Sequence, residues 1–290
     1  SARQIVIGGF GAAGASTALA LLSGGVAPAD LLIFDSNPTA GGPSAGPDAR
    51  ILALNAGSRR FLTAIGAWER LSPEAHPMRA IAISDTALEE DIRPRLLDMT
   101  TPEEGEPLAH LVPLGLLNAT LRDLCREAGV EVTTARLAGF SVGDERIAVD
   151  LGDTQVSARL LIGADGAKSP IRLKAGIPTH GWAYGQTAIV ATIRHSLPHH
   201  GEAVQHFLPS GPFALLPLDE GRSSIVWSEK AAVAVDILAA DPGTQRRAIV
   251  ARAAGWRGDI LAVEALSAHP LQLRLARRFI DKRLALVAGR

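Results

Sequence analysis

The first 35 residues contain two apolar runs of strand length, separated by a segment rich in small residues. Residues 3–7 and 31–34 are short apolar runs, and the segment between them is a glycine-rich turn followed by an alanine- and leucine-rich stretch to about residue 22. A strand, a helix and a second strand in this order make a βαβ unit. Such a unit predicts a parallel sheet.

The middle of the chain mixes helical periodicity with further strand-like runs. Hydrophobic residues recur at helical spacing over residues 58–71 and 116–128, and Gly129 lies where a helix would end. Residues 37–48 are expected to be loop, and residues 89–106 to be loop or a pair of edge strands. Further strands are predicted at residues 78–85, 130–134, 146–151 and 156–162.

From about residue 181 the pattern changes to short strands separated by Pro/Gly turns, which predicts an antiparallel sheet. A helix is expected at residues 242–254, followed by two more strands. The fold class predicted for the whole chain is therefore α/β, with a Rossmann-like parallel sheet interleaved with an antiparallel-sheet domain. The strands expected in the antiparallel sheet are residues 187–194, 203–208, 213–218 and 223–228.

Composition and charge narrow the class of protein. Hydrophobic residues make up 47% of the 290 residues, charged residues 20%, and the net charge is -1, which favours neither nucleic acid nor an anionic membrane as a bulk partner. Cys125 is the single cysteine, so an internal disulfide is excluded and a reducing compartment is expected. With no signal segment before the first strand and no membrane-spanning run, we expect a soluble cytoplasmic protein.

The first chemical motif is the turn Gly9-Phe-Gly-Ala-Ala-Gly14. Gly9 would make the tight turn, Gly11 would let a pyrophosphate approach the backbone, and Gly14 would let the helix pack closely. Asp35 ends the next strand at the distance expected for a ribose-binding carboxylate. This arrangement predicts a dinucleotide site, and the alternative is a glycine-rich turn with no ligand.

The second motif is a strand that runs into Gly163-Ala-Asp-Gly166. Ser169 and Pro170 follow as a predicted helix N-cap and first helical residue. Asp165 and Gly166 then stand at a strand end on the ligand side of the sheet. The residues alone leave two interpretations open, a cofactor contact or a capped turn in which Asp165 bonds only backbone groups.

Together with three further stretches, these motifs resemble the ubiquinone-biosynthesis hydroxylase family, within the single-component flavin aromatic hydroxylases. The resemblance covers essentially the whole chain. The Gly-Ala-Asp-Gly segment is typical of flavin hydroxylases as a group, and the last of the three stretches is a specific signature. The three stretches are residues 50–68, with Arg50-Ile-Leu-Ala-Leu54 and Leu62-Thr-Ala-Ile-Gly-Ala-Trp68; residues 182–199, beginning Trp182-Ala-Tyr184-Gly-Gln186; and residues 207–227, beginning Phe207-Leu-Pro-Ser-Gly-Pro-Phe.

The resemblance implies an extended FAD bound in an interleaved two-domain protein. Gly9, Gly11 and Gly14 would face its pyrophosphate and Asp35 its adenosine ribose. The other implied contacts are Arg50 near the flavin side of the pyrophosphate, Arg122, and Asp165 with Gly166 near the phosphate and ribitol. The residues alone favour a solvated charge for both arginines. The implied FAD-binding domain comprises residues 1–75, 107–178 and 277–290, and the substrate domain residues 76–106 and 179–276.

The activity implied by the resemblance is hydroxylation of a phenolic, prenylated ring with NAD(P)H and O₂ in ubiquinone biosynthesis. Other ubiquinone-biosynthesis proteins, or a membrane surface, are the implied further partners. Two alternatives stay open: another FAD enzyme of the same fold, such as a reductase or halogenase, and a scaffold without catalysis. The second is raised because the family's third FAD motif, a Gly-Asp pair followed by a His-Pro segment, is replaced here by Ala288-Gly-Arg290. We therefore expect a fragment or natural truncation that lacks the C-terminal part of the family fold and holds FAD weakly.

The remaining chemical residues carry less specific expectations. His195, His199 and His200 are clustered, but no cysteine or carboxylate at ligand spacing accompanies them, so a solvated loop is expected and no metal site. Cys125 is expected to be a buried thiol, and no residue stands out as a catalytic acid or base. An aromatic substrate pocket, with core packing as the alternative for the first two, is predicted from Trp182, Tyr184, Phe213, Leu215 and Pro217.

Overall fold

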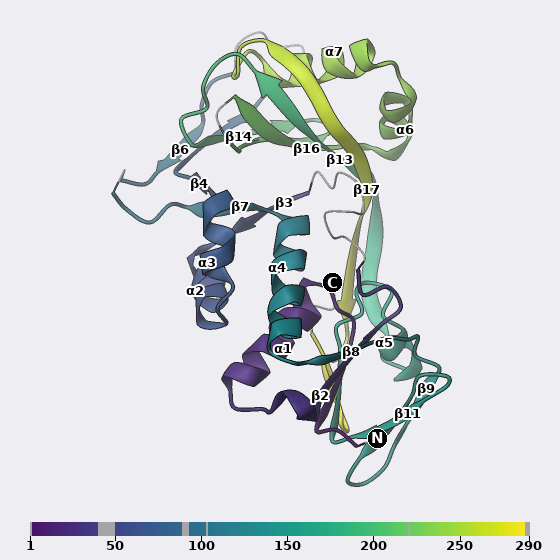
Figure 1. Ribbon diagram of the computed structural model, residues 1–290. Helices are drawn as coiled ribbons and strands as arrows, with labels where there is room; N and C mark the ends of the chain where they lie inside the picture. The colour runs from purple at the N-terminus through teal and green to yellow at the C-terminus, as the bar shows by residue number, and fades with distance from the viewer. Residues whose placement is uncertain (1, 40–49, 89–92, 103, 220, 288–290) are drawn as a thin grey trace.

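The computed structural model describes residues 2–39, 50–88, 93–102, 104–219 and 221–287. Figure 1 shows a lower body that contains α1, α4 and β2, and an upper body that contains β14, β16, α6 and α7. Two long strands, β13 (Thr179–His195) and β17 (Ile260–Ala276), run from one body to the other. Within the described part of the chain, no helix combines the length and the apolarity needed to cross a bilayer.

The lower body is built on a six-stranded sheet that confirms the predicted βαβ unit. Its order is β18-β19-β12-β1-β2-β8, and all neighbours are parallel except the edge pair β18 and β19. Because β1 and β2 lie side by side with α1 (Ala12–Ser23) between them in sequence, the glycine turn and Asp35 end at the same sheet edge. The strands are β1 (Ile5–Gly8), β2 (Leu31–Asp35), β8 (Glu131–Thr134), β12 (Leu160–Gly163), β18 (Ile280–Asp281) and β19 (Leu284–Leu286).

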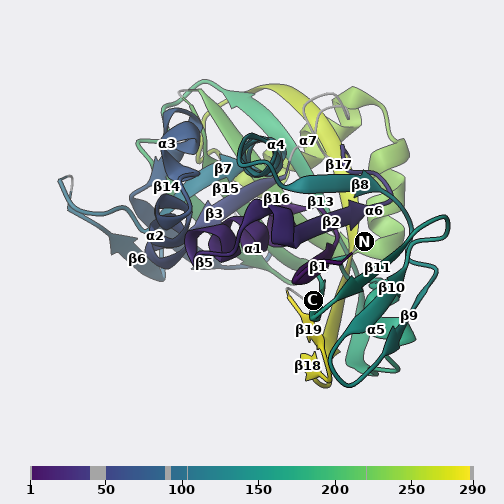
Figure 2. The same ribbon diagram turned by 60° about the horizontal axis from the view of Figure 1, so that its bottom comes forward.

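Successive side chains of these strands feed two separate cores, as the pleat of a buried sheet requires. Ile7, Ile33 and Ile162 pack with α1 and α4 (Leu114–Glu127). Val6 and Leu32 point to the other face. There they pack against a small antiparallel sheet, visible beside α5 (Pro170–Lys174) in Figure 2, whose strands are β9 (Gly139–Val142), β10 (Ile147–Asp150) and β11 (Gln155–Ala158).

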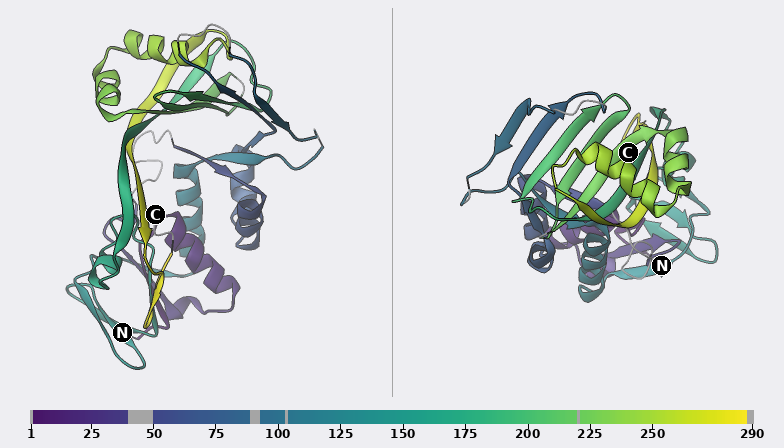
Figure 3. Two further views of the ribbon diagram at one scale, coloured as in Figure 1. Left: turned by 180° about the vertical axis from the view of Figure 1, so that it is seen from behind. Right: turned by 90° about the horizontal axis from the view of Figure 1, so that it is seen from above.

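The upper body is a seven-stranded sheet in the order β17-β13-β16-β15-β14-β5-β6. All neighbours are antiparallel except β14 and β5, so the predicted antiparallel sheet is confirmed with one parallel pair. Helices α6 (Ala231–Ala239) and α7 (Pro242–Ala253) cover one face, as the view from above in Figure 3 shows. The other strands are β5 (Ala80–Asp85), β6 (Leu97–Thr100), β14 (Glu202–Leu208), β15 (Gly211–Pro217) and β16 (Arg222–Lys230).

A three-stranded sheet in the order β3-β7-β4 lies between the two bodies in Figure 1. It joins β3 (Ile51–Leu54) to β7 (Ala109–Pro113), which leads into α4. Residues 58–71 form α2 (Ala56–Ala64) and the short α3 (Trp68–Leu71), and the side chain of Asn55 caps α2. The third strand is β4 (His76–Met78).

Two strand predictions were wrong in extent. The run 156–162 is two strands in different sheets, β11 and β12, with Arg159 between them. The predicted strand 78–85 begins at Ala80, because β4 before it pairs with β7 and not with the seven-stranded sheet. Residues 89–106 contribute the edge strand β6, although residues 89–92 and 103 lie outside the described residues, as do residues 40–49 of the predicted loop.

Candidate functional site: the pocket at the glycine turn

The glycine turn after β1 has the close approaches that the sequence predicted. Gly9 has a φ of +104°, and a Cβ atom on it would lie 2.4 Å from the backbone oxygen of Ala164. A Cβ atom on Gly14 would lie 1.9 Å from the oxygen of Gly9. Both positions therefore require glycine to let α1 and β12 pack against the turn.

Gly11 differs from these two glycines because its side-chain position is open. A Cβ atom there would have no atom within 4 Å, and the Gly11 backbone is extended with φ -78° and ψ -174°. Gly11 is also the N-cap of α1, where no side chain accepts a hydrogen bond from the first helical N–H groups. The turn thus leaves space and backbone donors together, which is the arrangement that binds phosphate at a helix N-terminus.

Asp35 at the end of β2 closes the turn from the other side. Its Oδ2 accepts a hydrogen bond from the backbone N–H of Phe10 at 2.7 Å, and its Oδ1 accepts from the N–H of Asn37 at 2.8 Å. Asp35 is only partly buried, so lone pairs on both oxygens still face the pocket. The carboxylate therefore shapes the turn in addition to the ribose contact expected of it.

Arg122 is a buried residue of α4, and the expectation of a solvated charge for it was wrong. Its side chain is 5% exposed, its Nε donates to the backbone oxygen of Phe10 at 2.7 Å, and its guanidinium lies 5.6 Å from the ring centre of Phe10. Burial lowers the pKa of Arg122, and the charge of Asp35 opposes that effect. The arginine holds the turn in place from the α4 side.

Arg50 marks the opposite end of the same pocket. It directly precedes β3, its backbone oxygen accepts from the N–H of Leu114 at 3.0 Å, and both residues line the pocket. Leu114 is the first residue of α4. The helix therefore runs along one wall of the pocket, from Arg50 beside its first residue to Arg122 about two turns later.

The second motif forms another wall of the pocket, and the capped turn that the sequence offered as one interpretation is present. Ser169 caps α5 by accepting from the N–H of Arg172 at 3.0 Å, and Asp165 Oδ2 accepts from the N–H of Ile171 at 3.0 Å. Asp165 Oδ1 is buried, and burial raises the pKa of this carboxyl. Gly166 beside it has a φ of +83°. Asp165 thus caps the helix, and its contact with a cofactor stays a prediction.

These walls enclose a pocket of about 820 Å³. Space at Gly11, donors at the α1 N-terminus and the partly buried carboxylate of Asp35 fit the pyrophosphate and sugar parts of FAD. The pocket is lined by Gly9, Gly11, Ala12, Phe34, Asp35, Ser36, Asn37, Arg50, Leu114, Asn118, Arg122, Ala135, Arg136, Leu137, Ala164, Asp165, Gly166 and Pro170.

Asn118 is one of the lining residues that the sequence does not single out. The leucine spacing predicts the helix 116–128 and gives its one asparagine no role. A signal was present, because Asn118 lies one helical turn before Arg122 and therefore on the same face.

The predicted substrate residues fall into two groups. Trp182 and Tyr184 lie on β13, are each 51% exposed and touch edge-to-face with ring centres 5.9 Å apart, so the core-packing alternative was wrong for them. Phe213, Leu215 and Pro217 are buried, the first two without any exposed surface. Phe213 and Leu215 pack in the core under α6 and α7, because alternate residues of β15 point to that face. Their assignment to a pocket wall is therefore corrected to core packing.

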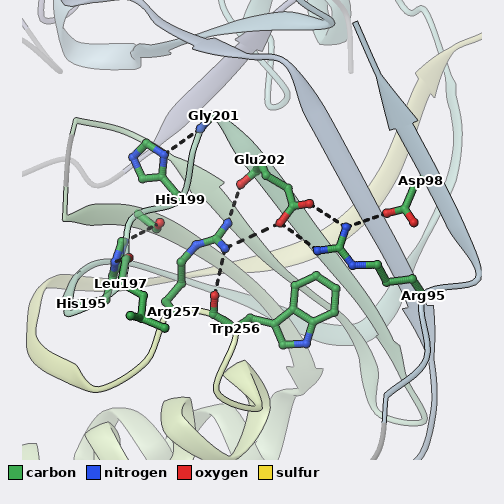
Figure 4. Close-up of polar contacts among 10 residues, drawn as sticks. Arg95, Asp98, His195, Leu197, His199, Gly201, Glu202, Trp256 and Arg257 are labelled. Carbon is green, nitrogen blue, oxygen red and sulfur yellow. Dashed lines mark hydrogen bonds and ion pairs between the residues drawn. The ribbon is translucent and has the colours of Figure 1, made fainter.

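His195 is the last residue of β13 and is buried, so the expected solvated loop was wrong for it, whereas His199 and His200 lie in the loop that follows. His195 Nδ1 donates to the oxygen of Leu197 at 2.8 Å, and His199 Nδ1 accepts from the N–H of Gly201 at 3.0 Å (Figure 4). Over the residues that the structure describes, no three histidine, cysteine or acidic side chains are placed to hold a metal ion. His195 and His199 order the loop, because each forms a hydrogen bond with its backbone.

Cys125 confirms the prediction of a buried thiol. It has no exposed surface, and its Sγ lies 3.4 Å from the backbone oxygen of Ala15 on α1. Burial raises the pKa of the Cys125 thiol to about 12. A thiol with this pKa is unreactive at neutral pH and packs as a small apolar residue.

Comparison with known proteins identifies the class of this site. The FAD binding domain family matches residues 2–289. Ubiquinone hydroxylase UbiL of Rhodospirillum rubrum is 35% identical over 287 residues, which cover 98% of this chain and 65% of that protein. The 3-demethoxyubiquinol 3-hydroxylase of Escherichia coli is 29% identical over 98% of this chain and 72% of its own. Rat ubiquinone biosynthesis monooxygenase COQ6 is 34% identical over 65% of this chain and 41% of its own.

Solved structures share the fold at low sequence identity. The flavin-dependent monooxygenase PieE, solved with FAD and substrate, has a TM-score of 0.76 at 19% identity, covering 100% of this chain and 53% of that one. PqsL of Pseudomonas aeruginosa, described as a probable FAD-dependent monooxygenase, has a TM-score of 0.78 at 16% identity, covering 99% and 78%. At these identities the comparison establishes the fold alone.

Proposed function

The chain belongs to the FAD-binding domain family and is a relative of the ubiquinone-biosynthesis hydroxylases, and on this premise we propose that it hydroxylates a phenolic, prenylated aromatic ring with FAD, NAD(P)H and O₂. The chain spans 65% of the length of its UbiL relative. One observation carries the proposal. The turn glycines, Asp35, Arg122 and Asp165 come from four separate segments and converge on one pocket.

At the adenosine end, the chain's groups would hold sugar and phosphate. Asp35 would accept hydrogen bonds from ribose hydroxyls, because its oxygens keep lone pairs beyond the two that bind backbone N–H groups. The pyrophosphate would lie over Gly11, where nothing occupies the side-chain position and the α1 N-terminus supplies positive potential.

At the flavin end, Arg50 and Asp165 would bracket the chain that leads to the ring. Asp165 lines this part of the pocket and would lie beside the ribitol, while Arg50 would offset phosphate charge. When bound, FAD supplies the electron acceptor for NAD(P)H and the site of O₂ activation. The sequence has one dinucleotide turn, so the nicotinamide would bind transiently. Trp182 and Tyr184 remain our candidates for contact with an aromatic substrate, because each leaves half its surface exposed.

The test of this function is a titration with FAD followed by turnover. Flavin fluorescence and the visible spectrum report binding, and Gly11→Val serves as the control that removes the phosphate space. NAD(P)H consumption is then measured with and without a prenylated phenol. Mass spectrometry of the product shows whether one oxygen atom has been added. Hydroxylation supports the proposal. Consumption without hydroxylation would indicate another flavin enzyme of this fold, and absence of FAD binding would indicate a scaffold.

Association with other ubiquinone-biosynthesis proteins or with a membrane surface stays a prediction from the resemblance. A cytoplasmic location stays a prediction from the cysteine count and the hydrophobic pattern. Co-sedimentation with vesicles made of zwitterionic or of anionic lipid tests the membrane part directly. Binding to neither vesicle would contradict it.

A further inference from the structure

Arg136 is a charged residue of the pocket lining that the proposed function does not use. It lies two residues after the end of β8 and is exposed, and none of the described residues forms a hydrogen bond or an ion pair with its guanidinium. Arg122, in contrast, is buried and donates to Phe10. The cation of Arg136 is therefore available to a molecule that occupies the pocket.

The parallel strands of the lower sheet lie in the order in which the parts of FAD are joined. That order is β12, β1, β2 and β8, and the last three lie next to one another in Figure 2. β12 leads to Asp165, β1 to the glycine turn, β2 ends at Asp35, and β8 leads to Arg136. The proposed function places the ribitol at Asp165, the pyrophosphate at the turn and the ribose at Asp35. Since the adenine is attached to this ribose, it would lie at the end of β8.

The end of β8 is joined to the ribose-binding residue by the sheet itself. Asp35 and Thr134 are partners in the strand register, and the N–H of Ala135 donates to the backbone oxygen of Asp35 at 3.0 Å. Ala135 and Leu137 are partly buried, pack against the core shared with β10 and β11, and line the pocket together with Arg136. Two apolar side chains and one planar cation therefore lie beside Asp35. A purine ring is held by this combination, because its faces accept both apolar contact and a stacked guanidinium.

We propose that Arg136 is a cofactor contact whose guanidinium lies against the adenine ring of FAD. The inference rests on the proposed FAD-binding function and adds the end of β8 to the three strand ends that the proposed function uses. It assigns the cation to the base and not to the pyrophosphate, because β2 separates β8 from the strand that leads to the glycine turn. Two strand spacings amount to roughly 10 Å.

The test compares Arg136→Met, Arg136→Lys and the matched control Arg159→Met with wild type. Arg159 is also exposed, but it directly precedes β12, at the opposite edge of the same sheet, and does not line the pocket. Calorimetric titration at low and at high salt measures dissociation constants for FAD and for ADP, which carries the adenosine and the phosphates without the flavin. Thermal unfolding without ligand measures the stability of each variant.

We expect Arg136→Met to weaken the binding of FAD and ADP by the same factor, roughly fivefold, as for a guanidinium over an aromatic ring. The factor should be the same at low and at high salt, because salt screens a contact with phosphate far more than one with a neutral ring. Arg136→Lys keeps the charge but loses the planar group, so it should recover only part of the affinity. The unfolding temperature should not change, since the ligand-free side chain bonds none of the described residues.

Nuclear magnetic resonance tests the contact directly. In wild-type protein labelled at arginine, the adenine protons of bound ADP should show nuclear Overhauser effects to an arginine side chain. These effects should be absent in Arg136→Met and present in Arg159→Met.

Several results would overturn the assignment of Arg136 to the adenine. They are unchanged FAD affinity in Arg136→Met, full recovery in Arg136→Lys, a loss that disappears at high salt, and adenine contacts that persist in Arg136→Met. An equal loss in the Arg159→Met control would overturn it as well. If wild type bound 2′-phosphorylated ADP more tightly than ADP, and Arg136→Met did not, the cation would belong to a ribose phosphate instead.

The failure of this inference can be told apart from the failure of the proposed function. If the wild-type protein bound neither FAD nor ADP, both would be overturned. If wild type and Arg136→Met bound FAD equally well, only the role of Arg136 would be.

Discussion

Arg122 and Phe10 are joined by a hydrogen bond of 2.7 Å from the arginine Nε to the phenylalanine backbone oxygen. Phe10 lies inside the glycine turn, and Arg122 lies on α4, more than a hundred residues later. The cofactor turn is therefore held from outside its own βαβ unit. A substitution in α4 should therefore change the conformation or stability of the turn even when the turn glycines are unchanged.

Replacing Arg122 tests this link. In Arg122→Met the Phe10 oxygen loses its buried donor, which should lower the free energy of unfolding by about 1–3 kcal/mol and also weaken FAD binding. Arg122→Lys keeps the charge but cannot reproduce the planar donor geometry, so it should recover only part of the affinity. Urea unfolding and FAD titration measure the two effects. Wild-type stability in Arg122→Met would contradict the role given to the bond.

Gly11 and Gly14 should respond in opposite ways to a side chain. Gly11→Val should fold with a change in unfolding free energy within about 1 kcal/mol, because its Cβ atom meets nothing and its backbone is extended, but FAD binding should be lost. Gly14→Val should fold poorly, because the Cβ atom would lie 1.9 Å from the oxygen of Gly9. Circular dichroism and flavin fluorescence distinguish the two outcomes. Retained FAD affinity in folded Gly11→Val would contradict the site.

Asp35→Asn should affect both the fold and the ligand. Both carboxylate oxygens accept backbone N–H groups. An amide can accept only one of them and turns its NH₂ group toward the other, so a loss of about 1–3 kcal/mol in unfolding free energy is expected together with weaker FAD binding.

The charge of Asp35 should also exclude a ribose 2′-phosphate. ADP and its 2′-phosphorylated form can be compared by calorimetric titration of the wild type, where the phosphorylated form should bind more weakly. The preference should shrink in Asp35→Asn. Equal binding of the two nucleotides by wild type would contradict the ribose assignment.

His206 should make stability depend on pH. It is fully buried on β14, bonds the Ser84 hydroxyl and has an unpartnered Nε2, and burial together with the charge of Arg93 lowers its pKa to about 4. The unfolded histidine has a pKa of about 6.5, so it takes up a proton first as pH falls. The contribution of neutral His206 is complete above pH 6.5 and is lost between about 6.5 and 4, by up to about 3 kcal/mol.

The variant His206→Gln isolates this contribution. Urea unfolding at several pH values between 7 and 4 should show a shallower loss of stability in the variant than in wild type. Parallel curves would mean that other groups, such as His195, whose pKa is also lowered by burial, produce the acid sensitivity.

The features that the sequence predicted well are those fixed by local backbone geometry. The turn glycines, the Ser169 cap and the end of α4 at Gly129, with φ +79°, each follow from one residue type that the local backbone requires. The same holds for the βαβ unit, whose apolar runs and turn occupy consecutive residues.

The features that it missed depend on contacts between distant segments. Val156 and Leu161 belong to different sheets, but no Gly or Pro marks the break at Arg159 between β11 and β12, and both residues pack in the same core. The burial of Phe213 and Leu215 depends on which face of β15 the helices α6 and α7 cover, and residues on both faces are apolar. Arg122 contacts the turn, and Asn118 lines the pocket, only because α4 packs beside the turn.

The strand order of the lower sheet also sets a sequence of events during synthesis. β1 pairs with β12, so Ile5 cannot form its sheet contact until Leu160 has been synthesised, and β12 in turn pairs with β19 at Leu284. The glycine turn is therefore synthesised long before the segment around Asp165, which forms another wall of the same pocket. Contacts this distant in sequence slow folding and leave apolar strands exposed meanwhile. The nascent N-terminal half should therefore depend on chaperones until the upper body has been made.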